Sequence, residues 1–427
     1  MKLNHFLKNR TVRNAGWIIG GRIANKLLAF LVGILTARYL GPSNYGLINY
    51  AATYITFFAS LCTLGINSVI IKDFVDHPGE EGEAIGTTLV LRAISSFLSA
   101  VMIVGVSSFL DREEPLTILV VAVSSLGLLF QIFDTLNQWF QYRLQSKYAS
   151  AAALISYIAV SGYKLYLLMN GKSVVWFALA TSVDYVVLAV VLLAAYRKNG
   201  GPRLKVSGRK AKQLLAASVS FILASLMASV YASTDKLMLK QLLDDSAVGY
   251  YGVAVSLSTT WAFVIQAVIT SVQPSIIQAY GVDRQLFEKR NIQLYAIVFY
   301  AATLVSLVIC LLAKVIVVFL YGEIYAQAIT PLRIVVWYTA FSYLGVARNT
   351  WMVCENKQKF LKYLYLCAAL VNVLLNALLI PRYGAAGAAM ASLLTQILTT
   401  FILPLLIRPL RANAVLMLDA ICLRKII

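Results

Sequence analysis

The sequence is short of the residues that metal sites and disulfide frameworks require. It has two histidines, His5 and His77, and both fall in polar end or loop segments. Its five cysteines have no paired spacing and no histidine neighbours, so we interpret them as small apolar fillers. No glycine-rich phosphate loop precedes a helix. We therefore expect no metal site, no cofactor and no catalytic constellation, which argues against an enzyme.

Charged residues are also scarce, at 13% of the 427 residues, whereas 60% are hydrophobic. Apolar runs recur along the whole chain, with loops too short to fold independently, which is typical of an all-α integral membrane protein. The N-terminus does not fit a cleaved secretory signal, because Arg22 and Lys26 interrupt its apolar run. We expect a retained first helix behind a short interfacial segment that contains Leu3, Phe6 and Leu7.

Apolar runs of about 20 residues predict twelve transmembrane helices. The first six are expected near residues 15–39, 45–71, 84–109, 115–140, 150–169 and 174–196. The other six are expected near residues 214–240, 248–272, 291–320, 328–353, 361–380 and 384–407. Breakers such as Gly41-Pro42, Pro78-Gly79 and Gly200-Gly201-Pro202 fall between the runs and support this count.

Acidic residues number 18 against 37 lysines and arginines, and the basic residues gather in alternate loops. Twenty-four lie in the segments that we place in the cytoplasm, and five lie in the opposite loops, at Arg38, Arg112, Lys172, Lys240 and Arg382. The positive-inside rule therefore predicts that both termini are cytoplasmic, and it explains the net charge of +19 better than a nucleic-acid partner does.

A basic loop at residues 197–212 divides the chain into two halves. We expect a six-helix lobe at residues 1–200 and a second six-helix lobe at 201–427, with a short cytoplasmic tail. Both halves enter the membrane from the same side, so the repeat is expected to be parallel, with a pseudo-twofold axis along the membrane normal. A weak match between residues 45–51 and 248–254 agrees with it. This arrangement favours a transporter with a central cleft.

Apart from the residues already assigned to loops, basic residues outnumber acids within the predicted helices, with eight against three. Lys26 lies roughly 16 Å past the start of the first apolar run, near mid-membrane, where a cation normally faces protein or a water-filled cavity. We predict that Arg22, Lys26, Arg92 and Lys164 line a cavity for an anionic passenger. Ion pairs with Asp134 or Asp184, or a buried network joining the first, third and fourth helices, are the alternatives. Lys236, Lys314, Arg333 and Arg348 lie nearer the surfaces, where anchoring by snorkelling is an equal interpretation.

The three intramembrane acids have separate predicted roles. Asp134 and Asp184 are candidates for proton or sodium coupling, because burial favours the protonated form of a carboxylate. Asp235 and Lys236 point about 100° apart on a helix, so each is expected to meet another helix, as a gate or a lobe contact. Tyrosines at predicted membrane ends, including Tyr50 and Tyr251, are interpreted as an interfacial belt, with sugar stacking as the alternative.

Several segments resemble one family in order and spacing. Residues 36–46 (TARYLGPSNYG) and 64–68 (LGINS) are similar to the opening of the bacterial O-antigen (Wzx-type) flippases. Residues 233–239 (STDKLML) and 379–389 (LIPRYGAAGAA) resemble later landmarks of that family. The resemblance covers nearly the whole chain. It implies membership of the multidrug, oligosaccharidyl-lipid and polysaccharide exporter superfamily.

The resemblance implies a flippase that moves undecaprenyl-pyrophosphate-linked oligosaccharide from the cytoplasmic to the periplasmic leaflet by alternating access. Arg22, Lys26 and Arg92 are our choice for the diphosphate, since arginine suits bidentate capture of phosphate. It also implies the bacterial inner membrane, membrane lipids as surroundings, and a polysaccharide polymerase and a chain-length regulator as partners. A multidrug exporter of the same fold is the second hypothesis. A membrane-embedded polymerase or ligase is the third, although such enzymes are expected to carry a large periplasmic loop.

Overall fold

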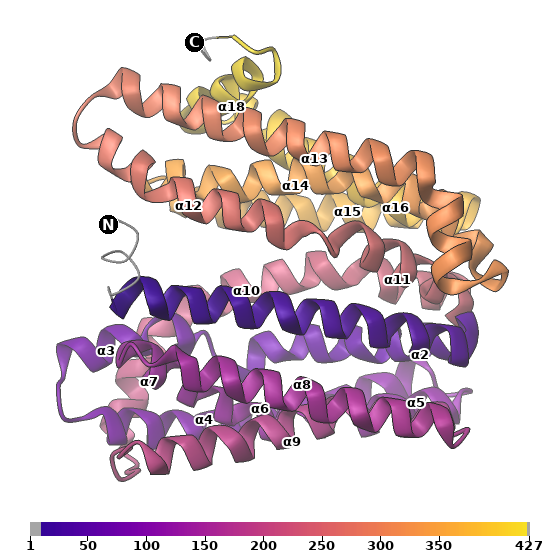
Figure 1. The fold of residues 1–427 in the computed structure, drawn as a ribbon, viewed down its shortest axis with the longest axis horizontal. Coiled ribbons are helices and arrows are strands. Elements are labelled where there is room, and N and C mark those ends of the chain that lie inside the picture. Colours follow the sequence, from indigo (N-terminus) through magenta and orange to yellow (C-terminus); the bar gives the residue numbers. More distant parts are fainter. Residues whose placement is uncertain (1–9, 425–427) are drawn as a thin grey trace, which may run out of the picture. The chain divides into compact units, whose positions relative to one another are not determined.

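The computed structural model describes residues 10–424, and within them the side chains of residues 20, 25–67, 69–219, 221–222 and 225–424. Every regular element in this part of the chain is a helix, as predicted (Figure 1). The predicted interfacial segment with Leu3, Phe6 and Leu7 lies outside the described residues. The chain divides into two compact units. Unit 1 comprises Met1–Leu40 with Leu47–Ser229, and unit 2 comprises Gly41–Gly46 with Val230–Ile427.

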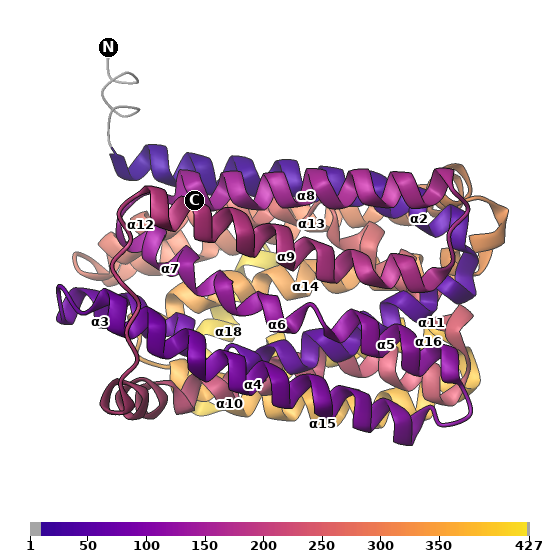
Figure 2. The same cartoon turned by 90° about the horizontal axis from the view of Figure 1, so that it is seen from below.

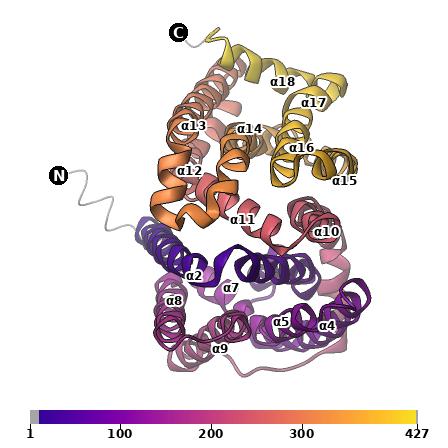
Figure 3. The same cartoon turned by 90° about the vertical axis from the view of Figure 1, so that its right-hand side faces the viewer.

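Unit 1 is a helical bundle with a core around Trp139 and Tyr196. Figure 3 shows its long helices end on, with α9 packed against both α8 and α5. Its elements are most of α2 (Arg10–Cys62), η1 (Ile66–Ser68), α3 (Ile70–Asp76), α4 (Glu81–Leu110), α5 (Pro115–Ser125), α6 (Leu128–Gln131), η2 (Ile132–Asp134), α7 (Thr135–Tyr142), α8 (Ser146–Met169), α9 (Val174–Lys198) and the first part of α10 (Gly208–Leu242).

Unit 2 is a second helical bundle, in which α14 packs against α11, α13 and α16. Its core includes Tyr295, Trp351 and Met417. Its elements are the end of α10, α11 (Asp245–Thr259), α12 (Ala262–Tyr280), α13 (Arg284–Tyr321), η3 (Glu323–Ala328), α14 (Ile329–Cys354), η4 (Gln358–Phe360), α15 (Leu361–Tyr383), α16 (Ala385–Ile397), the π-helix η5 (Leu398–Ile402), α17 (Leu403–Leu406) and α18 (Arg408–Ile421).

Nine helical segments of the described chain are long and apolar enough to cross a membrane. Their long axes can be followed in Figure 2. The other three predicted spans are α10 and the two arms of α2, which meet at Gly41. Gly41 has φ 71° and ψ 173°, which are not helical angles, and Pro42 follows it. Because glycine reaches positive φ readily and proline suits a first helical turn, this pair ends one helix and starts the next. The predicted twelve-span all-α fold is confirmed.

Large apolar side chains are exposed on the outside of the helical bundles, as expected for helices that contact lipid. On α13, Leu304, Leu311 and Phe319 are all exposed, and on α4 Phe97 is exposed. In water such stripes would cost free energy, whereas lipid is as apolar as these side chains. The exposed apolar stripes therefore agree with the predicted transmembrane helices.

The basic loop at residues 197–212 is attached to unit 1 along much of its length. The backbone N–H of Lys205 donates to the carbonyl of Gly82 at 3.1 Å. Lys210, on the first turn of α10, forms ion pairs with Glu80 at 2.8 Å and with Asp73 at 3.3 Å. The chain passes from unit 1 to unit 2 within α10, between Ser229 and Val230. The predicted lobe boundary at residue 200 stays a prediction.

The C-terminal segment, predicted as a short tail, forms an amphipathic helix, α18. It packs against α13 and α17. Asn413 on α18 donates to the hydroxyl of Tyr295 at 2.7 Å, and the hydroxyl of Tyr300 donates to the carbonyl of Ile421 at 2.7 Å. At 14 residues α18 is too short to span a bilayer, which is why a search for spanning runs does not find it.

Candidate functional site

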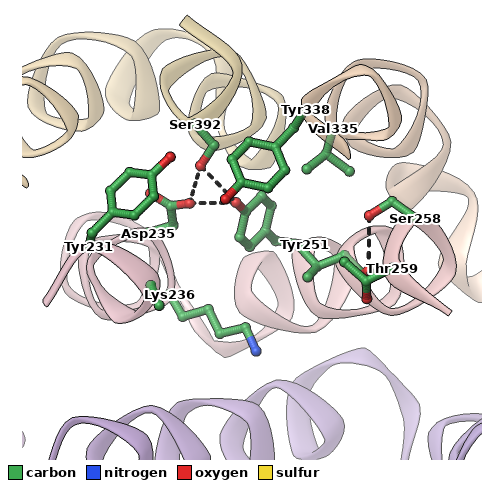
Figure 4. A pocket seen from close by; sticks show the side chains of 11 residues that line it. Tyr231, Asp235, Lys236, Tyr251, Ser258, Thr259, Val335, Tyr338 and Ser392 are labelled. Carbon is green, nitrogen blue, oxygen red and sulfur yellow. Dashed lines mark hydrogen bonds between the residues drawn. The ribbon is translucent and has the colours of Figure 1, made fainter. Parts of the chain in front are cut away.

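The most enclosed carboxylate among the predicted site residues is Asp235, on α10 in unit 2. Its side chain is buried and accepts three hydrogen bonds, which come from three other helices. The Tyr251 hydroxyl of α11 donates to Oδ2 at 2.5 Å, the Asn376 amide of α15 donates to Oδ1 at 2.7 Å, and the Ser392 hydroxyl of α16 donates to Oδ2. Asp235 therefore ties four helices of unit 2 together, and Figure 4 shows its bonds to Tyr251 and Ser392.

Two further contacts extend this set of hydrogen bonds. Asn372 and Asn376 are one helical turn apart on α15, so they lie on one face, and the Asn376 amide also donates to Asn372 Oδ1 at 2.9 Å. Tyr251 and Ser392 contact one another at 3.2 Å. We refer to Asp235, Tyr251, Asn372, Asn376 and Ser392 as the Asp235 cluster.

A cavity of about 240 Å³ adjoins the Asp235 cluster. Tyr231, Tyr338 and Ser258 contribute to its wall. Lys236 also lines it, but Figure 4 shows the Lys236 side chain directed away from the Asp235 carboxylate. This separation agrees with the predicted 100° offset between the two neighbours. The two residues nevertheless attract one another electrostatically.

The Asp235 cluster has the chemistry of a site for a proton or a monovalent cation. A single carboxylate surrounded by hydroxyl and amide groups offers oxygen ligands, which hard cations prefer. Rotation of the two hydroxyls and of an amide would turn oxygen lone pairs toward a cation. The described residues contain no group of three or more His, Cys, Asp or Glu side chains that could hold a metal ion.

Arg92 of α4 lies in a different environment, in unit 1. Its guanidinium donates to Thr135 Oγ1 at 2.8 Å, to Asn67 Oδ1 at 2.7 Å and to the Thr63 carbonyl at 3.3 Å. The residue is 2% exposed. Arg92 thus forms a buried network, which was the alternative interpretation of this residue. The network joins the second, third and fourth predicted helices and does not include the first.

The other predicted site residues of unit 1 form two small groups. Asp134 accepts a hydrogen bond from Asn137 and attracts Arg92 electrostatically. It lies in η2, a tight turn between α6 and α7. Asp184 of α9 accepts a hydrogen bond from Ser156 of α8 and attracts Lys164 electrostatically. The structure therefore places an acid near each of the two predicted cations Arg92 and Lys164.

Lys26 is exposed on α2, and the side chain of Arg22 lies outside the described residues. Arg92 and Lys164, the other two predicted cations, have Asp134 and Asp184 as electrostatic neighbours. The predicted role of these four residues as a cavity for an anion stays a prediction.

The interpretation of Tyr50 and Tyr251 as members of an interfacial belt is wrong. Both are buried, and both donate to buried carboxylates, Tyr50 to Asp111 at 3.1 Å and Tyr251 to Asp235. Sequence reasoning also missed Asp111, because it lies two residues past the end of the third predicted helix and so outside every predicted span. The tyrosines four residues apart at 50 and 54, which both bond to Asp111, were the available signal.

Comparison with known proteins identifies relatives of both halves of the chain. Residues 11–280 match the family described as Polysaccharide biosynthesis protein, and residues 221–378 match the family described as MatE. No curated protein sequence matches the chain.

Solved structures with the same fold are transporters and flippases. A multidrug resistance MATE family transporter of the MOP superfamily, in an inward-facing conformation, has a TM-score of 0.68 at 17% identity, over 93% of this chain and 98% of its own. The lipid II flippase MurJ, in an inward closed conformation, has a TM-score of 0.72 at 14% identity, over 95% of this chain and 91% of its own. A MOP superfamily transporter from Pyrococcus furiosus has a TM-score of 0.65 at 16% identity, over 95% of this chain and 96% of its own. These likenesses show the fold, which is the two-lobed architecture of twelve helices predicted from the sequence.

Proposed function

Because the chain belongs to the family of polysaccharide biosynthesis proteins, we propose that it is a flippase for undecaprenyl-pyrophosphate-linked oligosaccharide, an O-antigen or related repeat unit. It would carry this conjugate from the cytoplasmic to the periplasmic leaflet of a bacterial inner membrane. The observation that carries the proposal is the family match over residues 11–280 of a chain with a MOP superfamily fold. The similar lipid II flippase supports a lipid-linked passenger.

The mechanism we propose is alternating access without covalent chemistry. The glycan and diphosphate would enter a cleft that opens toward the cytoplasm, while the polyprenyl tail stays in lipid. Arg22, Lys26, Arg92 and Lys164 would neutralise the diphosphate, which is costly to bring into an apolar layer uncompensated. To engage a ligand, Arg92 would have to exchange its bonds with Thr135 and Asn67. Both termini are cytoplasmic in this proposal, and a polymerase and a chain-length regulator are its partners.

The energy for outward movement has two candidate sources. An inside-negative membrane potential assists an anion leaving the cytoplasmic side, by ~2.3 kcal/mol per charge per 100 mV. Alternatively, a carboxylate exchanges a proton or Na⁺ on each cycle. Asp134 and Asp184 are candidates from the sequence, while Asp235 and Lys236 would form a gate or lobe contact. The three donors around Asp235 add this carboxylate to the coupling candidates.

The experiment that tests the function uses purified protein in proteoliposomes with a short-chain lipid pyrophosphate that carries a fluorescent oligosaccharide. We expect protein-dependent movement between leaflets, measured by quenching from one side, which increases with an imposed potential. The double variant Arg22→Glu, Lys26→Glu should reduce transport at least about tenfold while still inserting, because charge reversal repels the diphosphate. Unchanged transport in this variant would refute the assignment of these cations, and no movement by the wild type would refute the function.

Ion coupling is tested in the same vesicles with the variants Asp134→Asn, Asp184→Asn and Asp235→Asn. With an imposed potential and no ion gradient, movement driven by the potential alone should persist in all three. If transport requires a pH or Na⁺ gradient, and one variant abolishes that requirement, that carboxylate is the coupling residue and movement by potential alone is wrong.

A multidrug exporter is the second candidate, because residues 221–378 match MatE and multidrug transporters share the fold. Such a protein should move cationic dyes. Dye efflux from the vesicles without movement of the lipid-linked oligosaccharide would favour the exporter. The surplus of basic over acidic residues in the predicted spans, eight against three, supports the flippase.

A further inference from the structure

Arg348 of α14 is a buried cation with spare hydrogen-bonding capacity. The residue is 6% exposed. Its guanidinium donates a single hydrogen bond, from Nη1 to the Thr399 carbonyl at 3.1 Å. The Nε atom is buried and has no hydrogen-bond partner among the described residues. Arginine has five N–H donors in a planar fork. Arg348 is therefore not the snorkelling surface anchor that its sequence position allowed.

No carboxylate within the described residues forms an ion pair with Arg348. Its single acceptor lies in the π-helix η5, where the wider turn changes the backbone hydrogen bonding. A buried charge without a counter-ion is expensive, and proteins normally pair it or neutralise it. The exposed Arg284 provides a contrast, since it forms ion pairs with both Glu288 and Glu355. The counter-charge that Arg348 lacks within the protein can be supplied by a ligand.

Arg348 lines a cavity of about 200 Å³ in unit 2. A cavity of about 150 Å³ can hold benzene, so this space is large enough for one charged group or one sugar ring. The wall includes Tyr231, Tyr338, Tyr365 and Gln396. Tyrosine rings and amides are suited to the apolar faces and hydroxyl groups of a sugar. We call this space the Arg348 cavity.

We propose that the Arg348 cavity is an oxyanion subsite, in which the guanidinium binds a carboxylate or phosphate group of the passenger while the tyrosines contact the adjoining sugar. This inference rests on the proposed function and adds a second anion site, separate from the cations of unit 1. A bidentate arginine fits both types of oxyanion. The passenger would be an acidic glycan, or the diphosphate at a later stage of its crossing.

The Arg348 cavity shares two side chains with the cavity beside Asp235. Tyr231 and Tyr338 line both, and the Tyr231 hydroxyl donates to Gln396 Oε1 at 3.2 Å on the Arg348 side. An oxyanion that moves either tyrosine therefore changes the surroundings of Asp235 as well. We expect binding in the two cavities to be coupled, with reciprocal effects on affinity.

The test measures binding of three small probes to the full-length protein in nanodiscs by isothermal titration. The probes are methyl glucuronide, inorganic pyrophosphate and methyl glucoside, which is the neutral match of the first. We expect methyl glucuronide, pyrophosphate or both to bind at least about tenfold more tightly than methyl glucoside, since a charged hydrogen bond contributes more than a neutral one. Preference for the glucuronide assigns the subsite to an acidic sugar, and preference for pyrophosphate assigns it to the lipid carrier. Equal affinity for all three probes would overturn the proposal.

Two variants place the binding at Arg348. Arg348→Gln should abolish the preference for the anionic probe, and Arg348→Lys should retain part of it, because charge survives without the fork. Arg333→Gln is the matched control, since Arg333 lies on the same helix, carries the same charge and is exposed. Equal losses in Arg348→Gln and Arg333→Gln would contradict the proposal.

A cavity-filling variant keeps the test decisive if Arg348→Gln does not fold. Gly345 lines the cavity, and a Cβ there would lie 3.6 Å from Gln396 Nε2, an ordinary contact distance. Gly345→Val should therefore fill the space and weaken binding at least about fivefold without removing the charge. Gly105→Val is its control, because no atom lies within 4 Å of the position of its added Cβ. Anion binding unchanged in folded Gly345→Val would overturn the subsite.

The transport assay separates this inference from the proposed function. If the wild type binds the anionic probe but moves no lipid-linked oligosaccharide, the flippase proposal fails and the subsite stands. If the wild type moves the conjugate and Arg348→Gln binds every probe as tightly as the wild type does, the flippase proposal stands and the subsite fails.

Discussion

Arg92 in unit 1 and Arg348 in unit 2 are both buried arginines within predicted transmembrane helices, yet their surroundings differ. Arg92 donates three hydrogen bonds to a hydroxyl, an amide and a carbonyl, from residues on either side of its own helix in sequence. Arg348 donates one, to a carbonyl, and faces a cavity. Arg92 thus joins helices of unit 1 by hydrogen bonds, whereas Arg348 in unit 2 has N–H donors that no acceptor in the described part of the chain uses.

The difference shows that intramembrane charge by itself does not identify a ligand site. An arginine whose donors have protein acceptors already has its desolvation compensated. A ligand at Arg92 must first replace those acceptors, whereas a ligand at Arg348 gains unused donors. Each hydrogen bond to a ligand should therefore contribute more binding free energy at Arg348 than at Arg92. The Arg92 side chain should contribute more to the free energy of unfolding.

The largest expected effect is on folding, from Arg92→Met. Loss of the guanidinium leaves Asn67, Thr135 and the Thr63 carbonyl without their shared donor, so we expect destabilisation by about 3–5 kcal/mol. Arg348→Met should cost less, about 1 kcal/mol or below, because it breaks one bond and removes an uncompensated charge. Thermal unfolding of both variants in the same detergent measures the difference.

Arg333→Met is the control for the loss of one charge from α14, since Arg333 is exposed. An Arg348→Met variant that melts at or below the temperature of Arg92→Met would break the comparison. In that case Arg348 also belongs to the framework of its unit.

A smaller effect is expected from Thr135→Val, which deletes a single acceptor of Arg92. Thr135 Oγ1 accepts from Arg92 and donates to the Ile132 carbonyl at 2.8 Å. Loss of one bond to a charged group predicts destabilisation by about 1.5–3 kcal/mol. Thr56→Val is the control, because Thr56 makes an exposed bond to the Ala52 carbonyl in its own helix. Equal stability of the two variants would mean that the bond between Arg92 and Thr135 contributes nothing measurable.

Spans and breakers could be predicted from the sequence because they depend on local properties. Apolar length places the helices, and Gly41-Pro42 marks a boundary through backbone angles that only those residues favour. The amphipathic α18 was missed because its pattern serves packing on α13 and not a crossing of the membrane. Its buried Asn413 bonds to Tyr295, a partner 118 positions away.

The site could be predicted only in part, because burial depends on partners that are distant in sequence. Asp235 was singled out, but Tyr251, Asn376 and Ser392 come from three other helices, and nothing in their local patterns connects them. The position of Arg348 along its helix likewise suggested a snorkelling anchor near the membrane surface, although neighbouring helices bury its side chain. Spacing along one helix predicts which side chains share a face, and it does not predict what that face meets.

The smallest expected effect concerns the basic loop at residues 197–212, which we call the linker. Here Lys210 pairs with the acids Glu80 and Asp73 of unit 1. Lys210 bonds to Glu80, and this hydrogen bond holds the pKa of the Glu80 carboxyl below its ordinary value. A carboxyl whose pKa is lowered in the folded state adds stability above its unfolded pKa, about 4.3, and loses it as pH falls through the folded value. The amides of Lys205 and Ser207, which bond to Gly82 and Thr87, report whether the linker stays attached.

We expect hydrogen-exchange protection of these two amides, after correction for intrinsic rates, to be constant near neutral pH and to fall below about pH 4. Glu80→Gln should lower protection at pH 7 by a small factor, on the order of two, because Lys210 keeps its pair with Asp73. It should also flatten the acid dependence. Glu83→Gln, a neighbouring acid on α4, is the control and should behave as the wild type does. The same acid dependence in Glu80→Gln as in the wild type would assign linker attachment to Asp73 or to the backbone bonds. The ion pair with Glu80 would then contribute nothing measurable to holding the linker.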